Sequence, residues 1–308
     1  MMRLICTGCV RFTRWLPLWT LGLAILGYIH PPLLTWISKD FINWFFALTM
    51  FGIGLALDID LFIPTLKRPQ WIFLGNITQF TVMPALGFFA GIYLGGSNDI
   101  LVGFVLVGAV PGAMASNVIS YLARADVAYS VLMTTSATLL APLLTPAITK
   151  ALVGASIEIP FWSMSWQVLW LTAIPIVLGI SIRRFVRRWV EPLEPLSSAL
   201  ASLAIVVICA YIIAVNQAQF VALNVWVFVA VVLMNALGMI FGYAAGVLYR
   251  LDEKRRRALS FQIGMQNAGL GAVLAINNFS PSTALPSALF ATWCVLTASF
   301  LAGIWGRR

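Results

Sequence analysis

Long apolar stretches separated by short polar interruptions make up almost the whole chain. Charged residues, or clusters of proline, glycine and asparagine, end each stretch. A bilayer core of ~30 Å requires ~20 apolar residues in a helix, so each stretch predicts a membrane-spanning helix. Ten helices are expected, to within several residues at each end: 15–29, 41–57, 70–94, 100–123, 127–149, 164–182, 195–216, 224–249, 258–278 and 284–306.

Composition supports the same fold class, an all-α integral membrane protein. Hydrophobic residues make up 61% of the chain and charged residues 9%, whereas soluble domains carry about 25% charged residues. The longest polar loop, about 183–194, is too short to fold alone. Residues 1–308 are therefore expected to form a single membrane domain.

The distribution of Lys and Arg predicts the orientation, because cytoplasmic loops carry an excess of these residues. With the N-terminus inside, ten crossings leave only Lys39 and Lys150 outside. Both termini are then cytoplasmic, and so compact a chain suggests a bacterial inner (plasma) membrane. The remaining 17 of the 19 basic residues lie inside: Arg3, Arg11, Arg14, Lys67, Arg68, Arg124, Arg183, Arg184, Arg187, Arg188, Arg250, Lys254, Arg255, Arg256, Arg257, Arg307 and Arg308.

The net charge of +9 does not indicate a nucleic-acid partner. The basic residues occupy short loops beside membrane spans, and not one continuous soluble face. Contact with anionic headgroups of the lipid bilayer is the simpler interpretation.

Two parts of the chain resemble one another at a nearly constant separation. The segment MPALG at 83–87 recurs as MNALG at 234–238, and Ser116-Asn117 is matched by Gln266-Asn267. Two five-helix repeats are therefore expected, about 15–149 and about 164–306. Because five is odd, the second repeat would cross the membrane in the opposite sense, as in many secondary transporters. Chance recurrence of small-residue motifs is the alternative.

Two of the predicted helices contain polar breaks at mid-membrane depth. Residues 108–117 combine proline and glycine with Ser116 and Asn117, and residues 264–271 place two amides among three glycines. Unwound backbone in a bilayer is tolerated only where it is buried in protein or lines a cavity. Freed carbonyls and amide oxygens suit a hard cation such as sodium, and half-helix amino ends suit an anion. Further oxygens come from Gln79 and from Ser130, Thr134 and Thr138, although Ser and Thr often only bond their own helix.

The helices around the breaks lack charged residues and histidine. Ranges 70–94, 100–123, 127–149, 224–249 and 258–306 contain no Asp, Glu, Lys, Arg or His. A hydrolytic site or a proton relay would need such a group, so the sequence argues against an enzyme and against proton coupling. The only histidine, His30, lies at a membrane boundary beside two prolines, where a structural role is expected.

At the breaks the sequence resembles the bile acid:sodium symporter family, from about residue 40 to 305. The resemblance rests on PGAMASN at 111–117, YLAR at 121–124, LLTP at 143–146 and GMQNAGL at 264–270. It implies ten helices in two inverted repeats, with a panel domain (helices one, two, six and seven) and a core domain in which the broken helices cross. It further implies alternating-access transport of bile acids or smaller organic anions with two sodium ions, the only metal ions expected.

The resemblance also implies roles for particular residues. One sodium site would use Ser116, Asn117, Ser130, Thr134 and Gln262. The other would use Gln79, Gln262, Gln266 and the backbone carbonyls of Ile263 and Met265. Substrate would contact Asn267 and Asn117, with Met114 making the crevice less polar.

The sequence departs from the family at one position. Gln262 stands where members have an acidic residue that would touch both ions. An amide oxygen can coordinate sodium, but two cations without a nearby carboxylate repel one another strongly. A natural member with altered coupling and a deliberate substitution that holds one conformation both fit this replacement.

The main hypothesis is sodium-coupled symport of a bile acid or related organic anion into the cytoplasm. The uncharged core and Gln262 also fit an uncoupled facilitator or exchanger. An intramembrane enzyme lacks an acid, a base and a nucleophile, and a receptor lacks a soluble output module after the last helix.

Overall fold

The computed structural model describes residues 16–57, 69–155, 157–190, 194–218 and 224–306, and nearly all of them are helical. The first half contains α2 (Leu16–Ile29), α3 (Pro32–Thr35), α4 (Lys39–Ala56), α6 (Pro69–Leu94), α7 (Asn98–Ala109), α8 (Ala115–Leu122) and α9 (Val127–Val153). The second contains α10 (Phe161–Val168), η2 (Leu169–Ala173), α11 (Ile174–Val190), α12 (Glu194–Val215), α14 (Val225–Leu248), α15 (Glu253–Gly264), α16 (Ala268–Asn278), η4 (Pro281–Ala284) and α17 (Leu285–Trp305).

Each of the ten predicted ranges corresponds to one helix or to a run of consecutive short helices. Within the described residues, five helices are long and apolar enough to cross a membrane: Pro69–Leu94, Val127–Val153, Phe161–Phe185, Val225–Leu248 and Pro281–Trp305. Shorter apolar helices accompany them, among them Asn98–Ala109 and Ala268–Asn278. The chain is therefore an all-helical integral membrane protein, and the number of crossings stays a prediction.

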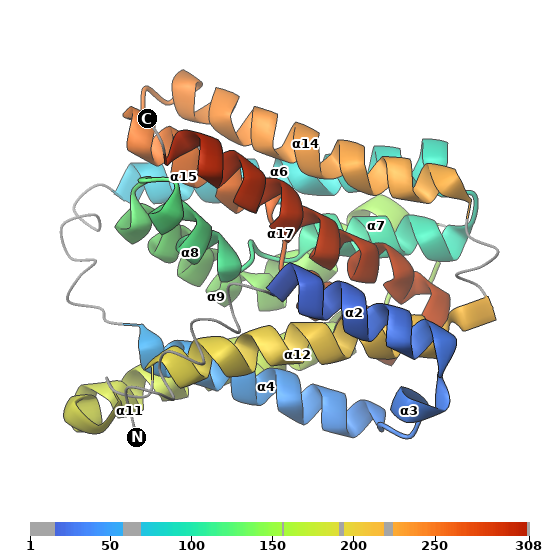
Figure 1. Cartoon of the computed structure of the whole chain (residues 1–308). Coiled ribbons are helices and arrows are strands. Elements are labelled where there is room, and N and C mark those ends of the chain that lie inside the picture. The colour runs from blue at the N-terminus through green and yellow to red at the C-terminus, as the bar shows by residue number, and fades with distance from the viewer. Residues whose placement is uncertain (1–15, 58–68, 156, 191–193, 219–223, 307–308) are drawn as a thin grey trace.

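The helices form two layers (Figure 1). In the lower layer α11 packs on α4, and α12 packs on α2 and α4. In the upper layer α6 packs on α7 and α14, and α14 packs on α15. The sixth predicted helix joins the layers, since its first part, α10, contacts α9 and α16 while its last part, α11, contacts α4. The division into a panel domain and a core domain stays a prediction, since the sixth helix contacts both layers.

The sixth helix is longer than the predicted range 164–182 and contains a π-helical turn. Pro175 has no N–H to donate to the preceding turn, and η2 directly precedes it. Beyond the turn, a Cβ at Gly54 would collide with Ile176 O, and one at Gly179 with Phe51 O. Glycine at both positions therefore allows α4 and α11 to approach closely.

Helices α6 and α14 pack against each other through the two similar segments, MPALG at 83–87 and MNALG at 234–238. A Cβ built on Gly238 would lie 2.7 Å from Met83 Sδ, and one built on Gly87 would lie 3.3 Å from Met234 Cε. The methionine of each segment therefore packs on the glycine of the other segment. Such reciprocal contacts are characteristic of a two-fold arrangement.

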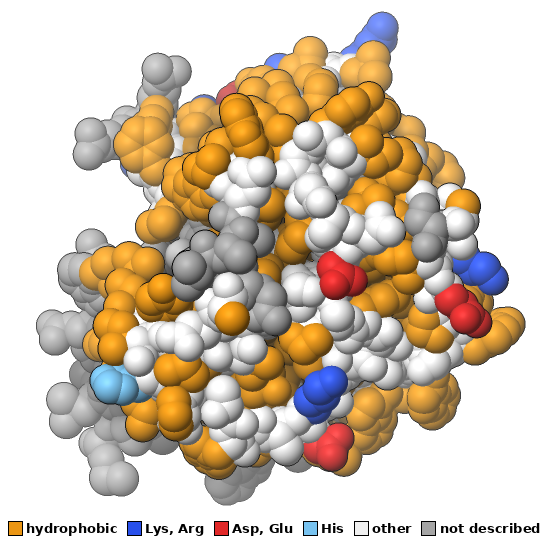
Figure 2. All heavy atoms as spheres, turned by 90° about the vertical axis from the view of Figure 1, so that its right-hand side faces the viewer, with side chains coloured by type: hydrophobic (Ala, Val, Ile, Leu, Met, Phe, Trp, Pro, Cys, Tyr) orange, Lys and Arg blue, Asp and Glu red, His pale blue; other side chains and the backbone are white. Residues whose placement is uncertain are grey.

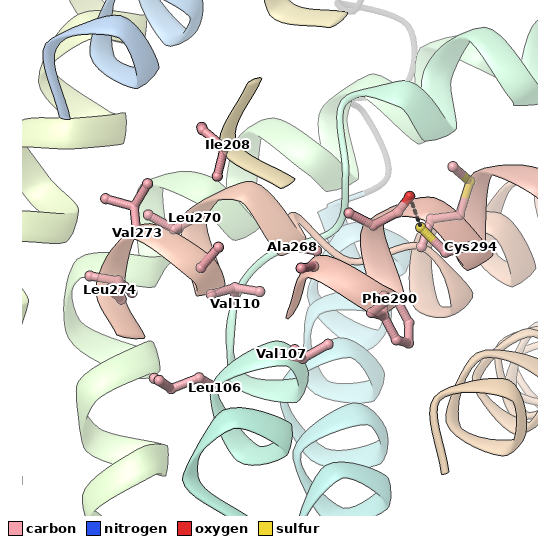
Figure 3. Close-up of a cluster of buried hydrophobic side chains, with 14 of the residues drawn as sticks. Leu106, Val107, Val110, Ile208, Ala268, Leu270, Val273, Leu274, Phe290 and Cys294 are labelled. Atoms are coloured by element: carbon pink, nitrogen blue, oxygen red, sulfur yellow. Dashed lines mark hydrogen bonds between the residues drawn. The ribbon is translucent and has the colours of Figure 1, made fainter. Parts of the chain in front are cut away.

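The two predicted breaks are present. Helix α7 ends at Ala109 and α8 begins at Ala115, while α15 ends at Gly264 and α16 begins at Ala268. Apolar side chains surround the breaks, including Val107 before the first break, Val110 within it and Leu270 after the second, with Phe290 of α17 beside them (Figure 3). The breaks thus lie in the packed interior.

Two tight turns of the same form lie at one end of the molecule. Each reads L-x-R-x-D, over residues 122–126 between α8 and α9 and over 248–252 between α14 and α15. Arg124 and Arg250 adopt φ of 54° and 55°, and the Asp126 and Asp252 side chains cap the following helices. Arg255 joins the turns, because its Nε lies 3.1 Å from Asp126 Oδ2 and its Nη1 lies 2.6 Å from Asp252 Oδ2.

We call this end, at the left of Figure 1, the basic end. Its basic residues within the described helices and turns are Arg124, Arg183, Arg184, Arg187, Arg188, Arg250 and Lys254 to Arg257. Several of the basic residues that predict the orientation lie outside the described residues: Arg3, Arg11, Arg14, Lys67, Arg68, Arg307 and Arg308.

Candidate functional site

The two helix breaks cross and are hydrogen bonded to each other. Ala113 N donates to Met265 O at 2.8 Å, and Asn267 N donates to Pro111 O at 2.8 Å. These bonds form an antiparallel bridge between Gly112 and Gln266. Each break therefore satisfies backbone groups of the other, which apolar surroundings could not do.

The crossing brings four half-helix ends together. The carboxyl ends of α7 and α15 and the amino ends of α8 and α16 all flank the paired strands of backbone. Thr145 Oγ1 of α9 donates to the free carbonyl of Ala109 at 2.7 Å, and Asn267 Oδ1 accepts from Leu270 N at 3.2 Å. Partial charges of both signs thus converge in one buried region.

A first group of oxygens surrounds Gln262, and we call it the Gln262 cluster. Its members come from α8, α9 and α15: Ser116, Asn117, Ser130, Thr134 and Gln262. Gln262 Oε1 accepts from Ser116 Oγ at 2.8 Å and from Thr134 Oγ1 at 2.9 Å. Asn117 Oδ1 accepts from Ser130 Oγ at 2.8 Å and from Thr134 Oγ1 at 3.2 Å. The structure therefore brings all five residues predicted for the first sodium site into contact.

Gln262 itself is fully buried, and only one end of its amide is satisfied. Its Nε2 has no hydrogen-bond partner among the described residues. A Cβ added to Gly112 would collide with this amide, so the glycine of the first break leaves room for the side chain of the second. An unpaired buried N–H group is costly, and here it replaces the second oxygen that a carboxylate would present.

A second group of oxygens, the Gln79 cluster, also adjoins the crossing. It consists of Gln79, Gln266 and the backbone carbonyls of Val110 and Ile263. Gln79 Nε2 donates to Gln266 Oε1 at 2.7 Å and to Val110 O at 3.1 Å, and Gln266 Nε2 donates to Ile263 O at 2.6 Å. Gln79 Oε1 is buried and lacks a partner among the described residues. An orphaned oxygen beside several carbonyls suits a cation.

The predicted carbonyl of Met265 is already engaged, since it accepts the bond from Ala113 N. A carbonyl oxygen carries two lone pairs, so one stays available. Thr138, considered from its spacing, donates to Thr134 O of its own helix at 2.7 Å. It therefore stands outside both clusters.

The three residues predicted for substrate lie beside the crossing. Asn267 is 9% exposed and caps α16. Asn117 and Met114 are half-buried, and Asn117 Nδ2 approaches Met114 Sδ at 3.9 Å. Phe46 of α4, which sequence reasoning missed, approaches from the other layer, because a Cβ on Gly269 would lie 3.2 Å from its ring.

Sequence reasoning also missed a supporting pair outside the clusters. Asn235 Nδ2 donates to Gly264 O at 2.8 Å, and its Oδ1 accepts from Thr297 Oγ1 at 2.6 Å. The pair secures the carbonyl at the end of α15. The sequence could have indicated Asn235, because it is the one strongly polar residue of the repeated segment 234–238.

The two clusters contain only neutral side chains. Among the described residues there is also no group of three His, Cys, Asp or Glu residues that could hold a metal ion. The donors present are hydroxyl, amide and carbonyl oxygens, which match the preference of hard cations. The arrangement offers ion coordination without acid–base chemistry.

Comparison with known proteins adds a family match. Residues 44–223 match the Sodium Bile acid symporter family. The chain is 34% identical to the uncharacterized sodium-dependent transporter YocS of Bacillus subtilis, over 94% of this chain and 90% of that one. It is 31% identical to the probable chloroplastic sodium/metabolite cotransporter BASS1 of Arabidopsis thaliana, over 94% and 73%. It is 28% identical to the human ileal sodium/bile acid cotransporter, over 76% and 68%.

Proposed function

Because the chain belongs to the sodium bile acid symporter family, whose members are transporters and not enzymes, we propose that it couples sodium entry to the import of an organic anion. The observation that carries this proposal is the buried crossing with two oxygen clusters beside it. The helices of the crossing region, over 70–94, 100–123, 127–149, 224–249 and 258–306, contain no Asp, Glu, Lys, Arg or His that competes for the role. Sodium and the anion are both substrates in this account.

The Gln79 cluster is the better of the two proposed sodium sites. Its free Oε1 and the carbonyls of Ile263 and Met265 would coordinate the ion, with the Gln266 amide oxygen beside them. All of these groups are neutral, so the ion would be held by dipoles. The positions are fixed by the backbone pairing of the breaks, which reduces the cost of ordering the ligands.

The Gln262 cluster is the weaker site. Its hydroxyls and Asn117 Oδ1 could coordinate a cation, but the unpaired Nε2 of Gln262 presents a donor where the ion needs an acceptor. We therefore propose reduced sodium affinity here, with the first site impaired and the second retained. If neither site binds sodium, the protein would be an uncoupled facilitator or exchanger, and the unpaired Nε2 of Gln262 is the observation that favours this alternative.

Ten crossings in two inverted repeats, about 15–149 and 164–306, form part of the proposal. The reciprocal packing of Met83 on Gly238 and of Met234 on Gly87 supports the pseudo-two-fold axis. The mutual hydrogen bonds of the two breaks support it as well. The ions would bind where the repeats meet, as in other inverted-repeat transporters.

We propose that the basic end faces the cytoplasm of a bacterial inner membrane. The described arginines cluster at that end, and Arg255 to Arg257 lie among the turns there. The opposite face, turned to the viewer in Figure 2, shows only scattered acidic and basic side chains. Lys39 and Lys150 belong to that side.

Alternating access would proceed by movement between the two layers. At the end opposite the basic end, three hydrogen bonds join α16 to α4 of the lower layer and to α10. Two of them link α16 to α4: Asn277 Nδ2 donates to Asn43 Oδ1 at 2.8 Å, and Lys39 Nζ donates to Ile276 O at 2.8 Å. The third links α16 to α10, where Asn278 Nδ2 donates to Gln167 Oε1 at 2.7 Å. We call these contacts the outer latch. They would be broken in an outward-open state, and their presence supports the proposal that this state is closed toward the outside.

The proposed anion is a bile acid or a smaller carboxylate. It would bind beside the crossing, near Asn267, Asn117 and Met114, where the amino ends of α8 and α16 offer partial positive charge. A relative is named for bile acid and another for a metabolite. Half-buried Met114 gives the neighbourhood an apolar side that suits a hydrophobic anion.

Sodium-dependent thermal stability of the purified protein tests the ion sites. A ligand that binds only the folded state raises its stability as RT ln(1 + [L]/Kd), so sodium is expected to raise Tm above the value in potassium. Gln266→Ala should abolish the difference. Thr138→Val, whose hydroxyl bonds only its own helix, should retain it. Equal Tm values in sodium and potassium for the unmodified chain would favour the uncoupled facilitator.

A further inference from the structure

A shallow groove lies on the outer surface of α14, α15 and α17. These three helices lie side by side at the upper left of Figure 1. Met239, Ile240, Tyr243, Leu301 and Trp305 line the groove. Both lining hydroxyls are already used, because Ser260 Oγ donates to Met239 O at 2.8 Å and Tyr243 OH donates to Glu253 Oε2 at 2.8 Å. The rest of the lining is apolar.

Close packing of α14 on α15 creates the groove. A Cβ at Gly242 would meet Leu259 O at 2.9 Å, and one at Gly246 would meet Arg256 Cα at 3.1 Å. On the outer side, exposed Ala244 is a small lining residue, and its methyl group leaves the space beside Ile240 and Tyr243 unfilled. A hydrocarbon chain can therefore lie against the helix.

Aromatic side chains mark the end of the groove nearest the basic end. Trp305 packs edge-on against Phe261, with ring centroids 5.1 Å apart, and Tyr243 OH donates to Glu253 Oε2 at 2.8 Å. Trp and Tyr with one apolar side and one polar contact are typical of the boundary between hydrocarbon and headgroups. This end of the groove thus lies at headgroup depth.

Positive charge exceeds negative charge beside this end. Residues 250–257 contain five basic and two acidic side chains. Glu253 pairs with Arg257, and Asp252 pairs with Arg255. Arg256 has no carboxylate within salt-bridge distance in the described part of the chain; its Nε donates to Leu251 O at 2.6 Å, and its guanidinium lies close to Tyr243 and Glu253. Arg250 and Lys254 are exposed.

We propose that this groove is a binding site for an anionic phospholipid, with an acyl chain against Ala244 and Ile240 and the phosphate beside Arg256, Arg250 and Lys254. The lipid belongs to the cytoplasmic leaflet if the basic end faces the cytoplasm as proposed above. Binding itself requires neither that orientation nor transport. The site is separate from the ion clusters, whose members face the crossing.

The experiment measures binding of phosphatidylglycerol to the delipidated full-length protein by native mass spectrometry, with phosphatidylcholine of the same chains as the comparison. Phosphatidylglycerol is expected to bind more tightly. Arg256→Gln and Lys254→Gln should each weaken its binding by roughly five-fold, the effect of one surface cation near lipid. Ala244→Trp, which fills the groove, should abolish the preference. Lys150→Gln, at the opposite end, serves as the matched control and should change nothing.

Three results would overturn the site. Equal binding of the two lipids would remove the headgroup preference. Retention of the preference in Ala244→Trp would assign it to surface charge outside the groove. Binding of glycerol phosphate alone, with equal affinity, would indicate a free phosphate site. None of these results depends on sodium-coupled uptake, so failure of the lipid site and failure of the proposed transport are distinguishable.

Discussion

The side-chain oxygen of Gln262 accepts a hydrogen bond from the hydroxyl of Ser116 at 2.8 Å, although the two residues are 146 positions apart in the chain. The bond joins α15 to α8 across the crossing of the two helix breaks. Thr134 of α9 donates to the same oxygen. Position 262 therefore links three helices of the site, and a charge introduced there would act on all three.

Replacement of this amide by a carboxylate is the most informative substitution. Gln262→Glu should lower Tm in sodium-free potassium buffer, because an uncompensated charge would be buried. Sodium should restore and exceed the original Tm, with half-maximal stabilisation at about ten-fold lower sodium concentration, or ~1.4 kcal/mol. The measurement is a sodium titration followed by thermal unfolding.

The matched control for this titration is Asn76→Asp. Asn76 is a buried amide on α6 that bonds Ser136 and Ile72, outside both clusters. It should lose stability without gaining sodium affinity. An equal gain at both positions would show that any added acid attracts sodium, and that position 262 has no special role.

Gly112→Ala tests the close approach of the breaks. Its Cβ would collide with the Gln262 amide, so we expect a loss of stability of about 1–3 kcal/mol, typical of overpacking, and a loss of transport. Gly303→Ala on α17, where a Cβ would meet nothing within 4 Å, should leave both unchanged. Unfolding midpoints of the two variants provide the comparison, and identical midpoints would argue against the collision.

A disulfide across the outer latch should arrest transport. Asn43→Cys combined with Asn277→Cys replaces a contact of 2.8 Å between α4 and α16, and oxidation would hold the layers together at that end. Uptake in liposomes should fall on oxidation and recover on reduction. Asn43→Cys alone controls for other thiols. Full uptake by a protein that is demonstrably cross-linked would contradict movement between the layers at this end.

Arg255→Lys tests the link between the two L-x-R-x-D turns. Lysine retains the charge but cannot bridge Asp126 and Asp252 with a planar guanidinium or stack on Trp71, whose ring centroid lies 4.3 Å from Arg255 Cζ. The Arg255–Asp126 pair is partly exposed, because 23% of the Arg255 side chain and 19% of the Asp126 side chain are accessible to solvent. We therefore expect the free energy of unfolding to fall by about 1 kcal/mol at most. Thermal unfolding at low and high salt measures it, and a salt-independent change would point to packing instead.

Most of the helix pattern could be predicted from the sequence, because burial in lipid requires long apolar stretches and leaves few alternatives. The breaks were also predictable. Pro111 and Gly112 in one helix, and the glycines around Gln266 and Asn267 in the other, disrupt otherwise apolar spans. The clustering of Ser116, Asn117, Ser130, Thr134 and Gln262 in the structure agrees with the residues that the family resemblance implied.

Other features depend on tertiary contacts that periodicity does not contain. The outer latch joins Asn277 to Asn43, two isolated amides in distant segments, and nothing local distinguishes them from solvated residues. The role of Thr145 as a partner of Ala109 O is equally invisible in sequence. The left-handed arginines were the exception, since the two L-x-R-x-D strings could have been recognised as equivalent helix-ending turns.

Uptake of a labelled bile acid into proteoliposomes tests the central claim most directly. A sodium gradient is compared with an equal potassium gradient, for the unmodified chain and for Gln266→Ala. The account predicts accumulation above the external concentration with sodium only, and its loss in Gln266→Ala. Uptake that merely equilibrates, at the same rate in sodium and potassium, would contradict sodium coupling and identify a facilitator.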